Sequence, residues 1–452
     1  MRNVHFIAIG GSAMHNLAIA LHTKGYKVTG SDDEVYEPSK SRLKKYDLLP
    51  DRMGWDTTRI DIQIDAVIVG MHAREDNVEL VKAQDLGLPI FSYPEFIYEQ
   101  TKDKCRVVIG GSHGKTSITS MILHVMQYNH VDVDYMVGAQ LNGFECMVKL
   151  TENNSVVILE GDEYLSSPID RRPKFHLYNP DIAVISGIAW DHINVFPTFS
   201  NYVEQFEIFT SKIAPNGSLI YCEDDDEVVK IAEKVRSDIR NIPYSTHEHF
   251  IEGGLTCLKT DVGDVSLSIF GEHNLQNLNC ARLVCNELGI SDDQFYIGIA
   301  SFQGASKRLE LVKQTNEALM YKDFAHSPSK LKATTTALKR QFPERELIAC
   351  MELHTFSSLN REFLLQYQGA MSNADRALVY YDPKVIEHKQ LSPISKEEVA
   401  DAFATSNVEV YTESNSIIDE LRKLNWTGKN LLMMSSGNFN GVDFMKLAEE
   451  LL

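Results

Sequence analysis

The sequence predicts an α/β protein with three domains and mostly parallel sheets. Apolar runs of strand length alternate with segments of helical period, glycine loops follow two of these runs, and 452 residues are enough for several domains. The apolar runs cover residues 4–9, 66–69, 107–109, 156–159, 182–185, 347–351 and 431–434.

Two polar segments divide the chain into the predicted domains. Residues 101–104 (Thr-Lys-Asp-Lys) precede a new strand and a glycine loop, and residues 303–306 (Gln-Gly-Ala-Ser) follow a helical segment. We therefore expect domains over residues 1–104, 105–304 and 305–452.

The composition is that of a globular chain, with 43% hydrophobic and 24% charged residues. Its net charge of −19 argues against a nucleic-acid or anionic-membrane partner, because long-range repulsion would oppose the encounter. A small anionic ligand can still bind where backbone N–H groups, a metal ion or local Lys and Arg side chains offset the acidic field. Any phosphate site has to meet this condition.

The cysteines and the apolar runs indicate the compartment. The seven cysteines are scattered without a C-x-x-C pair, so neither a disulfide framework nor a zinc cluster is expected. The first apolar run is too short and too early for a signal peptide, and no stretch approaches the roughly 20 apolar residues of a membrane span. We expect a cytoplasmic protein with no membrane insertion.

The strongest local pattern is a phosphate-binding loop after the strand at residues 107–109. Glycines let successive N–H groups point at phosphate oxygens, and the following helix adds its dipole. Lys115 would reach the β- and γ-phosphates, and the Thr116 hydroxyl would bind Mg²⁺. Ile109 occupies the first glycine position of the strict motif, so a tight turn with an exposed lysine is the alternative. The candidate phosphate-binding residues are Gly111, Ser112, His113, Gly114, Lys115, Thr116 and Ser117.

Candidate metal ligands follow the next apolar runs. Residues 160–163 (Glu-Gly-Asp-Glu) stand at the end of one run, and Asp191-His192 come after another. Ligands bind at the carboxyl edge of open parallel sheets. Glu160 and His192 are therefore candidates for Mg²⁺, and a histidine ligand would also admit Mn²⁺. A solvated acidic loop is the alternative explanation of residues 160–163.

The first domain begins with a degraded dinucleotide fingerprint. Residues 7–14 read Ile-Ala-Ile-Gly-Gly-Ser-Ala-Met, with alanine at the first and third glycine positions. Asp32 follows about 20 residues later, which would suit a nicotinamide-dependent dehydrogenase. That alternative leaves the loop at residues 111–117 unexplained.

Six motifs, in order, resemble the Mur ligase family. The family has Gly-Thr-His-Gly-Lys-Thr-Thr where residues 111–117 read Gly-Ser-His-Gly-Lys-Thr-Ser, and Glu-Ala-Asp-Glu where residues 160–163 stand. Its Asp-His pair is matched at 191–192 and its Gly-x-His-Asn-x-x-Asn at 271–277. Its Arg-Arg-Leu-Glu and Asp-Asp-[Phe/Tyr]-x-His-His-Pro are matched by residues 307–310 (Lys-Arg-Leu-Glu) and 322–328 (Lys-Asp-Phe-Ala-His-Ser-Pro). The resemblance covers essentially the whole chain.

The resemblance implies the fold of each domain and an ATP-dependent ligase. It implies a Rossmann-like UDP-binding domain over 1–104, a central P-loop ATPase domain with a parallel sheet over 105–304, and a C-terminal Rossmann-like α/β domain over 305–452. The implied catalytic residues are Lys115, Glu160, His192 and Arg308, and the implied metal ligands are Thr116, Glu160 and His192. Further ATP-binding residues would be His273, Asn274, Asn277, Arg308, Asp323 and His326. Without the other motifs, residues 271–277 would suit a strand end followed by an Asn-capped helix.

The resemblance also implies a UDP-sugar site in the first domain, with the diphosphate at the first helix N-terminus. The residues implied are Gly10, Gly11, Ser12, Ala13, Met14, Ser31, Asp32, His72 and Asn77.

Two branches of the family act directly on UDP-N-acetylmuramate: one adds L-alanine, and the other attaches the tripeptide L-Ala-γ-D-Glu-meso-diaminopimelate. Residues 169–175, 434–441 and 163–164 resemble the tripeptide branch, whereas residues 352–357 are closer to the alanine branch. We expect a tripeptide acceptor, with L-alanine as the alternative. The candidate acceptor-binding residues are Arg171, Arg172, Lys174, His354, Ser436, Asn438 and Phe439.

Several positions depart from the family pattern. Gly187 and Ala189 stand where relatives have Asn and Glu, and Lys322 and Ser327 replace one Asp and one His of the doubled pairs. A nucleotide-binding relative that has lost catalysis is therefore a further alternative.

Overall fold

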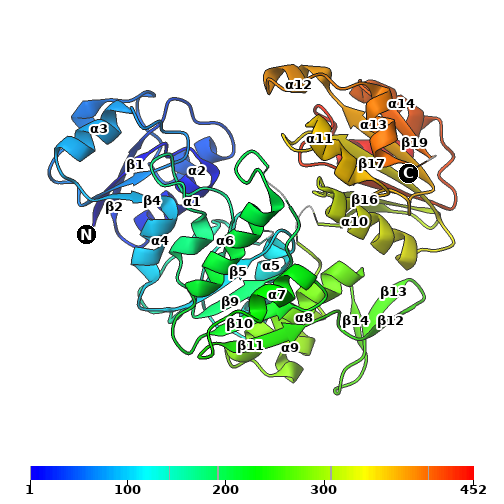
Figure 1. Ribbon diagram of the computed structural model, residues 1–452, viewed down its shortest axis with the longest axis horizontal. Coiled ribbons are helices and arrows are strands. Elements are labelled where there is room, and N and C mark those ends of the chain that lie inside the picture. The colour runs from blue at the N-terminus through cyan, green and yellow to red at the C-terminus, as the bar shows by residue number, and fades with distance from the viewer. Residues whose placement is uncertain (1, 142, 191–192, 306–307, 406) are drawn as a thin grey trace. The chain divides into compact units, whose positions relative to one another are not determined.

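The structure is a computed structural model that describes residues 2–141, 143–190, 193–305, 308–405 and 407–452 (Figure 1). The chain forms two compact units, each described here by itself. Unit 1 comprises residues up to 188 together with 199–244 and 280–290, and unit 2 comprises residues 189–198, 245–279 and 291–452.

The first sheet of unit 1 has four parallel strands in the order β2-β1-β3-β4. The strands are β1 (Asn3–Ile7), β2 (Lys27–Ser31), β3 (Ala66–Val69) and β4 (Ile90–Ser92). The helices are α1 (Ser12–Thr23), α2 (Ser39–Lys45), η1 (Thr57–Arg59), α3 (Val78–Asp85) and α4 (Tyr93–Thr101). The strand order reverses beside β1, so its carboxyl end lies at a switch point, where open α/β sheets bind ligands.

The second sheet of unit 1 has seven strands in the order β11-β10-β9-β5-β8-β6-β7, and only the β6–β7 pair is antiparallel. The strands are β5 (Cys105–Gly110), β6 (Asp134–Met136), β7 (Val148–Lys149), β8 (Val156–Glu160), β9 (Ile182–Ile185), β10 (Ser218–Cys222) and β11 (Arg240–Tyr244). The helices are α5 (Lys115–Tyr128), η2 (Lys174–Leu177), α6 (Phe199–Ser211) and α7 (Asp226–Ala232). Strands β8 and β9 flank β5, so the ends of all three strands meet at the start of α5.

Unit 2 contains a small antiparallel sheet and a larger mixed sheet. Strands β12 (His249–Glu252), β13 (Leu255–Leu258) and β14 (Val265–Leu267) form the small one. The larger sheet has the order β15-β16-β20-β17-β18-β19, with β15 antiparallel to β16 and the other pairs parallel. Its strands are β15 (Glu310–Gln314), β16 (Ala318–Asp323), β17 (Glu346–Leu353), β18 (Arg376–Tyr381), β19 (Val408–Tyr411) and β20 (Lys429–Met434).

Most helices of unit 2 cover the two faces of the larger sheet. They are α10 (Pro328–Gln341), α11 (Arg361–Leu364), η3 (Leu365–Tyr367), α12 (Pro383–His388), α13 (Lys396–Phe403), α14 (Ser414–Arg422) and α15 (Phe444–Leu451), whereas α9 (Asp292–Ile299) contributes no described residue to either apolar cluster of this sheet. Helix α8 (Glu272–Glu287) belongs to unit 2 up to residue 279 and to unit 1 from residue 280.

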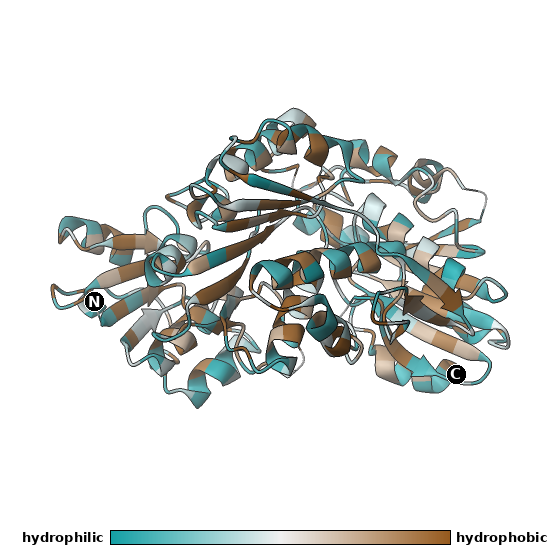
Figure 2. Ribbon diagram, turned by 90° about the horizontal axis from the view of Figure 1, so that it is seen from below, coloured by the Kyte–Doolittle hydropathy of each residue, from teal (hydrophilic) through white to brown (hydrophobic). Residues whose placement is uncertain are grey.

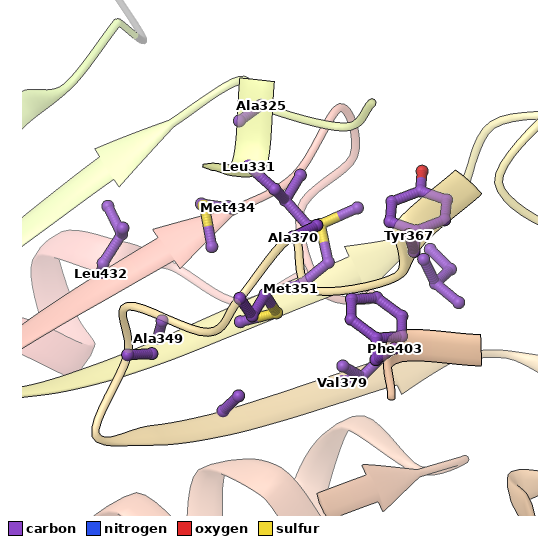
Figure 3. Close-up of a cluster of buried hydrophobic side chains, with 14 of the residues drawn as sticks. Ala325, Leu331, Ala349, Met351, Tyr367, Ala370, Val379, Phe403, Leu432 and Met434 are labelled. Carbon is purple, nitrogen blue, oxygen red and sulfur yellow. The ribbon is translucent and has the colours of Figure 1, made fainter. Parts of the chain in front are cut away.

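Alternate residues of β20 explain why the larger sheet is buried on two sides. Leu432 and Met434 point into the cluster that contains Leu331 of α10, Tyr367 of η3 and Phe403 of α13 (Figure 3). Their neighbours Leu431 and Met433 join the opposite cluster with residues of α14 and α15. A strand with both faces buried reads as a continuous apolar run, which is the pattern of residues 431–434. Figure 2 shows apolar residues concentrated along the strands.

The predicted α/β class with parallel sheets is confirmed, and each of the seven apolar runs forms or overlaps a strand. Helix α4 ends at Thr101 and β5 begins at Cys105, while β15 begins at Glu310. The exact domain boundaries remain predictions. Among the described residues, no helix is both long and apolar enough to span a membrane.

Candidate functional site

The phosphate loop connects β5 to α5 by a turn that favours glycine at two positions. Gly111 and Gly114 have φ angles of +130° and +77°, which favour glycine. A Cβ on Gly111 would lie against Ser186 Oγ and only 2.9 Å from Ser186 N. The loop therefore packs backbone to backbone on the residue that follows β9. Ile109 remains inside β5, so the turn needs no glycine at that position.

Hydrogen bonds from the end of β9 hold the loop in place. The Ser112 N–H donates to the Gly187 carbonyl oxygen (2.9 Å) and the Ser186 N–H to that of Gly110 (3.1 Å). The Ser186 hydroxyl donates to the His113 carbonyl oxygen. Gly187 itself has a φ of +147°, which explains a glycine at this departure from the family pattern.

Lys115 forms a buried ion pair at the first residue of α5. Its Nζ donates to Glu163 Oε2 (2.7 Å) and to the Gly111 carbonyl oxygen (2.6 Å). Burial opposes the charge, but the Glu163 and Asp162 carboxylates outweigh it and raise the pKa of Lys115 above its ordinary value. Lys115 is therefore charged at neutral pH. Its side chain is 14% exposed and is held by the buried Glu163, which argues against the exposed-lysine alternative.

The Lys115 pair limits what this lysine can contribute to phosphate binding. Glu163 is 1% exposed and also accepts a hydrogen bond from Tyr202 OH (3.1 Å), which is hydrogen-bonded to Ser112 Oγ (2.9 Å). Because Glu163 neutralises Lys115, the loop amides and a metal ion must supply much of the attraction for a triphosphate.

Thr116 and Glu160 come together next to this pair. The Thr116 hydroxyl donates to Glu160 Oε1 (2.8 Å), and the Gly138 N–H donates to Glu160 Oε2 (2.8 Å). A hydroxyl and a carboxylate are hard oxygen donors of the kind that suits Mg²⁺. These side chains fit the implied metal ion, which would neutralise phosphate oxygens when bound. No group of three or more His, Cys, Asp or Glu side chains that could hold a metal occurs among the described residues.

His192 and Asp191 lie outside the described residues, so the structure places neither side chain. Sequence reasoning named Glu160 but missed the partners Gly138, Ser186 and Tyr202. Ser186 could have been found, because it directly follows a strand predicted to neighbour the loop. Gly138 and Tyr202 carried no such signal.

The predicted diphosphate site lies at the amino end of α1. Gly11 precedes the helix, no side chain caps it, and Ser12 and Ala13 are exposed. Ala8 takes a φ of +67° at the first glycine position, and the N–H groups of Ala8 and Ile9 donate to the Ser31 carbonyl oxygen (2.9 and 3.0 Å). The turn therefore keeps its shape with alanine in place of glycine.

Asp32 is held inside this turn. Its Oδ2 accepts a hydrogen bond from the Gly10 N–H (2.7 Å), and the residue is 3% exposed. Burial raises the pKa of Asp32 to about 6, against the opposing effect of the Gly10 hydrogen bond. A carboxylate turned back onto the loop does not present itself to a ribose, which argues against the dehydrogenase alternative.

The other predicted uridine neighbours have structural partners. The Ser31 hydroxyl donates to Glu79 Oε2, and Glu79 is fully buried. Asn77 caps α3, accepting at Oδ1 from the N–H groups of Glu79 (3.0 Å) and Leu80 (3.2 Å). His72 is exposed. Met14 is buried in α1.

The ATP-binding residues predicted in unit 2 lie at the start of α8 and near the end of β16. Gly271 has a φ of +91°, and its added Cβ would lie 2.5 Å from Ala337 Cβ of α10. Burial lowers the pKa of His273 to about 4, so its ring is neutral near pH 7. The Asn274 side chain donates from Nδ2 to the Phe270 carbonyl oxygen (2.9 Å), and Asn277 is 8% exposed.

Asp323 organises the start of the third predicted domain. Its carboxylate accepts from the N–H groups of Leu309 (2.6 Å) and Ala325 (2.6 Å), and burial raises its pKa despite the Arg308 charge. The Arg308 guanidinium lies 4.9 Å from the centre of the Phe324 ring. His326 Nδ1 hydrogen-bonds the Phe324 carbonyl oxygen (2.9 Å).

The predicted acceptor-binding residues fall into two groups, one in each unit. In unit 1, Arg171 is exposed, Arg172 pairs with Asp170 and with Glu95, and Lys174 Nζ donates to Asp162 Oδ2 (2.6 Å). These pairs are sufficient to explain Arg172 and Lys174 structurally.

In unit 2, the second group lies at the carboxyl ends of β17 and β20. His354 Nδ1 is 3.8 Å from Glu352 Oε1, and Glu352 Oε2 accepts from the Phe439 N–H (2.8 Å). Ser436 Oγ is buried without a hydrogen-bond partner in the described structure, and Asn438 is exposed. Phe439 is fully buried and stacks on Tyr380 (5.9 Å between ring centres), which favours a packing role over contact with an acceptor.

A glycine loop on a parallel strand end, with a buried lysine and a neighbouring carboxylate, defines a P-loop nucleotide-binding protein. Three family models match the chain: "Mur ligase family, catalytic domain" at residues 3–104, "Mur ligase middle domain" at 109–285 and "Mur ligase, glutamate ligase domain" at 307–437. The chain belongs to the Mur ligase family. It is an ATP-dependent ligase of the kind that forms C–N bonds, and the resemblance inferred from its motifs is confirmed.

Relatives match over nearly the full length. A UDP-N-acetylmuramate–L-alanine ligase of Clostridium kluyveri is 30% identical over 455 residues, covering 97% of this chain and 96% of that protein. A murein peptide ligase of Psychrobacter arcticus has a TM-score of 0.64 at 21% identity, covering 100% and 98%. A UDP-N-acetylmuramate–alanine ligase of Thermotoga maritima has a TM-score of 0.69 at 16% identity, covering 99% and 98%. The two structural similarities show the fold.

We predict that Gly111→Ala weakens the binding of a magnesium nucleotide. The new Cβ would push the loop away from Ser186, and the left-handed backbone adds strain of about 1–3 kcal/mol. Calorimetric titration should show affinity reduced at least about tenfold. Gly87→Ala is the control, because Gly87 also has a positive φ (+65°) but meets nothing within 4 Å. Unchanged affinity in Gly111→Ala would contradict the loop geometry.

We predict that Asp32→Asn removes a pH dependence of stability. The folded-state pKa of about 6 lies above the ordinary value of 3.8, because the folded protein favours the protonated carboxyl of Asp32. This contribution to the stability of the wild type is fully present below pH 3.8 and is lost as the pH rises through 6. The free energy of unfolding of the variant, measured relative to that of the wild type, should therefore rise by on the order of 2 kcal/mol between pH 4 and pH 7. Urea unfolding of ligand-free protein at several pH values measures this, and parallel profiles would show that Asp32 does not titrate as expected.

Proposed function

We propose that this ligase joins the tripeptide L-Ala-γ-D-Glu-meso-diaminopimelate to the lactyl carboxylate of UDP-N-acetylmuramate. The observation that carries the ligase chemistry is the convergence of Lys115, Glu163, Thr116 and Glu160 on the loop held by Ser186. This is a site for activating a carboxylate with a triphosphate, because it combines loop amides, a buried cation and metal-binding oxygens.

The proposed reaction has two steps. The lactyl carboxylate attacks the γ-phosphorus of ATP, forming an acyl phosphate and expelling ADP. The acceptor amine then attacks the acyl carbon, and the tetrahedral intermediate loses a proton and expels phosphate. Such chemistry depends on alignment and on neutralising anionic oxygens.

The residues of the proposed site have the following parts in this reaction. The N–H groups of residues 111–117 and Lys115 would bind the β- and γ-phosphates, and Arg308 would contribute a second cation. Thr116, Glu160 and His192 would hold Mg²⁺. Glu163 would keep Lys115 in position, and the amino end of α1 would bind the UDP diphosphate.

The tripeptide acceptor is supported by two segments, one that leads into η2 and one that follows β20. Residues 169–175 and 434–441 resemble the tripeptide branch. The Ser436 hydroxyl lies in the second of these segments and has no hydrogen-bond partner in the described structure. It could therefore hydrogen-bond to a polar group of the peptide substrate.

L-Alanine is the second candidate acceptor. The 30% identity to the L-alanine ligase of Clostridium kluyveri and the His354 segment favour it. An amine-acceptor panel separates the two candidates. With UDP-N-acetylmuramate and ATP, phosphate release should be at least about tenfold faster at limiting tripeptide than at equal L-alanine, since a peptide offers more groups for binding. The reverse preference would establish the alanine reaction, and no release with any amine would favour a relative that has lost catalysis.

We predict that Lys115→Ala reduces phosphate release by at least about 100-fold without unfolding the protein, because it removes a cation aimed at the phosphates. Circular dichroism controls for folding, and Lys230→Ala is the control, because this lysine is exposed and pairs with Glu227 of α7. Undiminished turnover in Lys115→Ala would remove the phosphate-loop assignment.

A further inference from the structure

A short segment of unit 1 connects the two predicted substrate sites. We define the strap as residues 137–147, between β6 and β7, of which residue 142 lies outside the described part of the chain. Near its beginning, the Gly138 N–H donates to Glu160 Oε2 (2.8 Å), the carboxylate that also accepts from Thr116. Near its end, the strap contacts α1.

Asn16 of α1 anchors the end of the strap. Its Oδ1 accepts from the Met147 N–H (2.9 Å), and Cys146 Sγ lies 3.3 Å from its carbonyl oxygen. Asn16 is 3% exposed, and its Nδ2 donates to the Ser12 carbonyl oxygen (2.8 Å) at the amino end of the helix. A buried side-chain acceptor that satisfies a backbone N–H is costly to remove, so this contact fixes Met147 relative to the predicted diphosphate site.

The two ends of the strap are tied to each other. The Val137 N–H donates to the Met147 carbonyl oxygen (2.9 Å), and the Leu141 N–H donates to Met147 Sδ (3.2 Å). Leu141 and Met147 are 3% and 4% exposed. A displacement of Met147 therefore shifts the backbone beside Gly138, because the hydrogen bond at Val137 leaves little slack between them.

The strap also makes exposed polar contacts with the first predicted domain. Lys45 forms an ion pair with Glu145, with both side chains 62% exposed, and Tyr46 OH donates to the same carboxylate (3.0 Å). Exposed ion pairs of this kind contribute little, because water and salt screen them. Asn16, by contrast, makes a buried contact between α1 and the strap.

We propose that the strap couples the two substrate sites and that Asn16 is a positioning residue for Glu160. A UDP-sugar diphosphate at α1 would fix Asn16. Asn16 would in turn hold Met147, and the hydrogen bond between Val137 and Met147 would hold the Gly138 N–H in place. That N–H would keep the Glu160 carboxylate oriented for the metal ion that accompanies the nucleotide. By linkage, each ligand then raises the affinity of the other by the same factor. This inference rests on the proposed function, since it requires both ligands.

The experiment is a calorimetric titration of the full chain with Mg²⁺ and a non-hydrolysable ATP analogue, with and without saturating UDP-N-acetylmuramate. In wild type, the sugar nucleotide should tighten analogue binding at least about fivefold. Asn16→Leu keeps the bulk of the side chain but removes the oxygen that accepts the Met147 hydrogen bond. The ratio of analogue affinities with and without the sugar nucleotide should then fall below about twofold, while each ligand still binds alone. Lys45→Ala is the matched control on an exposed contact of the same strap and should keep the wild-type ratio.

Two further arms make each outcome decisive. Asn16→Gln keeps both the amide oxygen for the Met147 N–H and the amide nitrogen for the Ser12 carbonyl oxygen and should retain the coupling, so loss of coupling in this variant overturns the proposal even if Asn16→Leu does not fold. Equal ratios in wild type and Asn16→Leu, or no coupling in a wild type that binds both ligands, also overturn it. Failure of either ligand to bind wild type counts against the proposed function instead.

Discussion

The close approach of Gly111 to the end of β9 is the constraint on which the nucleotide site depends. With no side chain between them, the Ser186 hydroxyl and the Gly187 carbonyl oxygen can hold the backbone of the loop. Strands β8 and β9 flank β5, and all three are parallel, so Lys115 and Thr116 meet carboxylates from the β8 end. In a chain with a net charge of −19, the loop amides and one paired lysine are what this loop offers to an anion.

The sequence predicted much of this arrangement because its signals are local. Continuous apolar runs mark strands buried on both faces, and a glycine turn before Lys115 marks a strand–helix junction whatever the rest of the fold. The Rossmann-like turn of the first domain was also recognisable with alanine at two glycine positions. Ala8 shows why, since the turn needs a positive φ that alanine can adopt at a modest cost in strain.

The partners of these residues were harder to predict because they come from distant segments. Gly138 and Tyr202 contact Glu160 and Glu163 only through the packing of the sheet, and single glycines and tyrosines carry no periodic or motif signal. Asn77 and Phe439 illustrate the opposite difficulty. A motif suggested ligand contact, whereas a helix cap and an aromatic stack account for each of them. His192 remains a prediction, since it lies outside the described residues.

Two of the departures from the family pattern, Gly187 and Lys322, form consistent local structures. Gly187 takes a backbone conformation that favours glycine and offers its carbonyl oxygen to the loop. Lys322 stands opposite Glu310 in the β15–β16 pair and forms an ion pair with it (2.9 Å). Such compensation is expected where a changed residue has been accommodated, and it weakens the case that these changes report lost catalysis.

The position of β20 affects how unit 2 can be made. This strand, the last one described in the chain, lies in the middle of the larger sheet, between β16 and β17. During synthesis, β16 and β17 emerge from the ribosome more than 70 residues before the strand that separates them, as their bounds show. Until it arrives, their inner edges expose unpaired N–H and C=O groups, which makes the nascent sheet a substrate for chaperones and a point of vulnerability to aggregation.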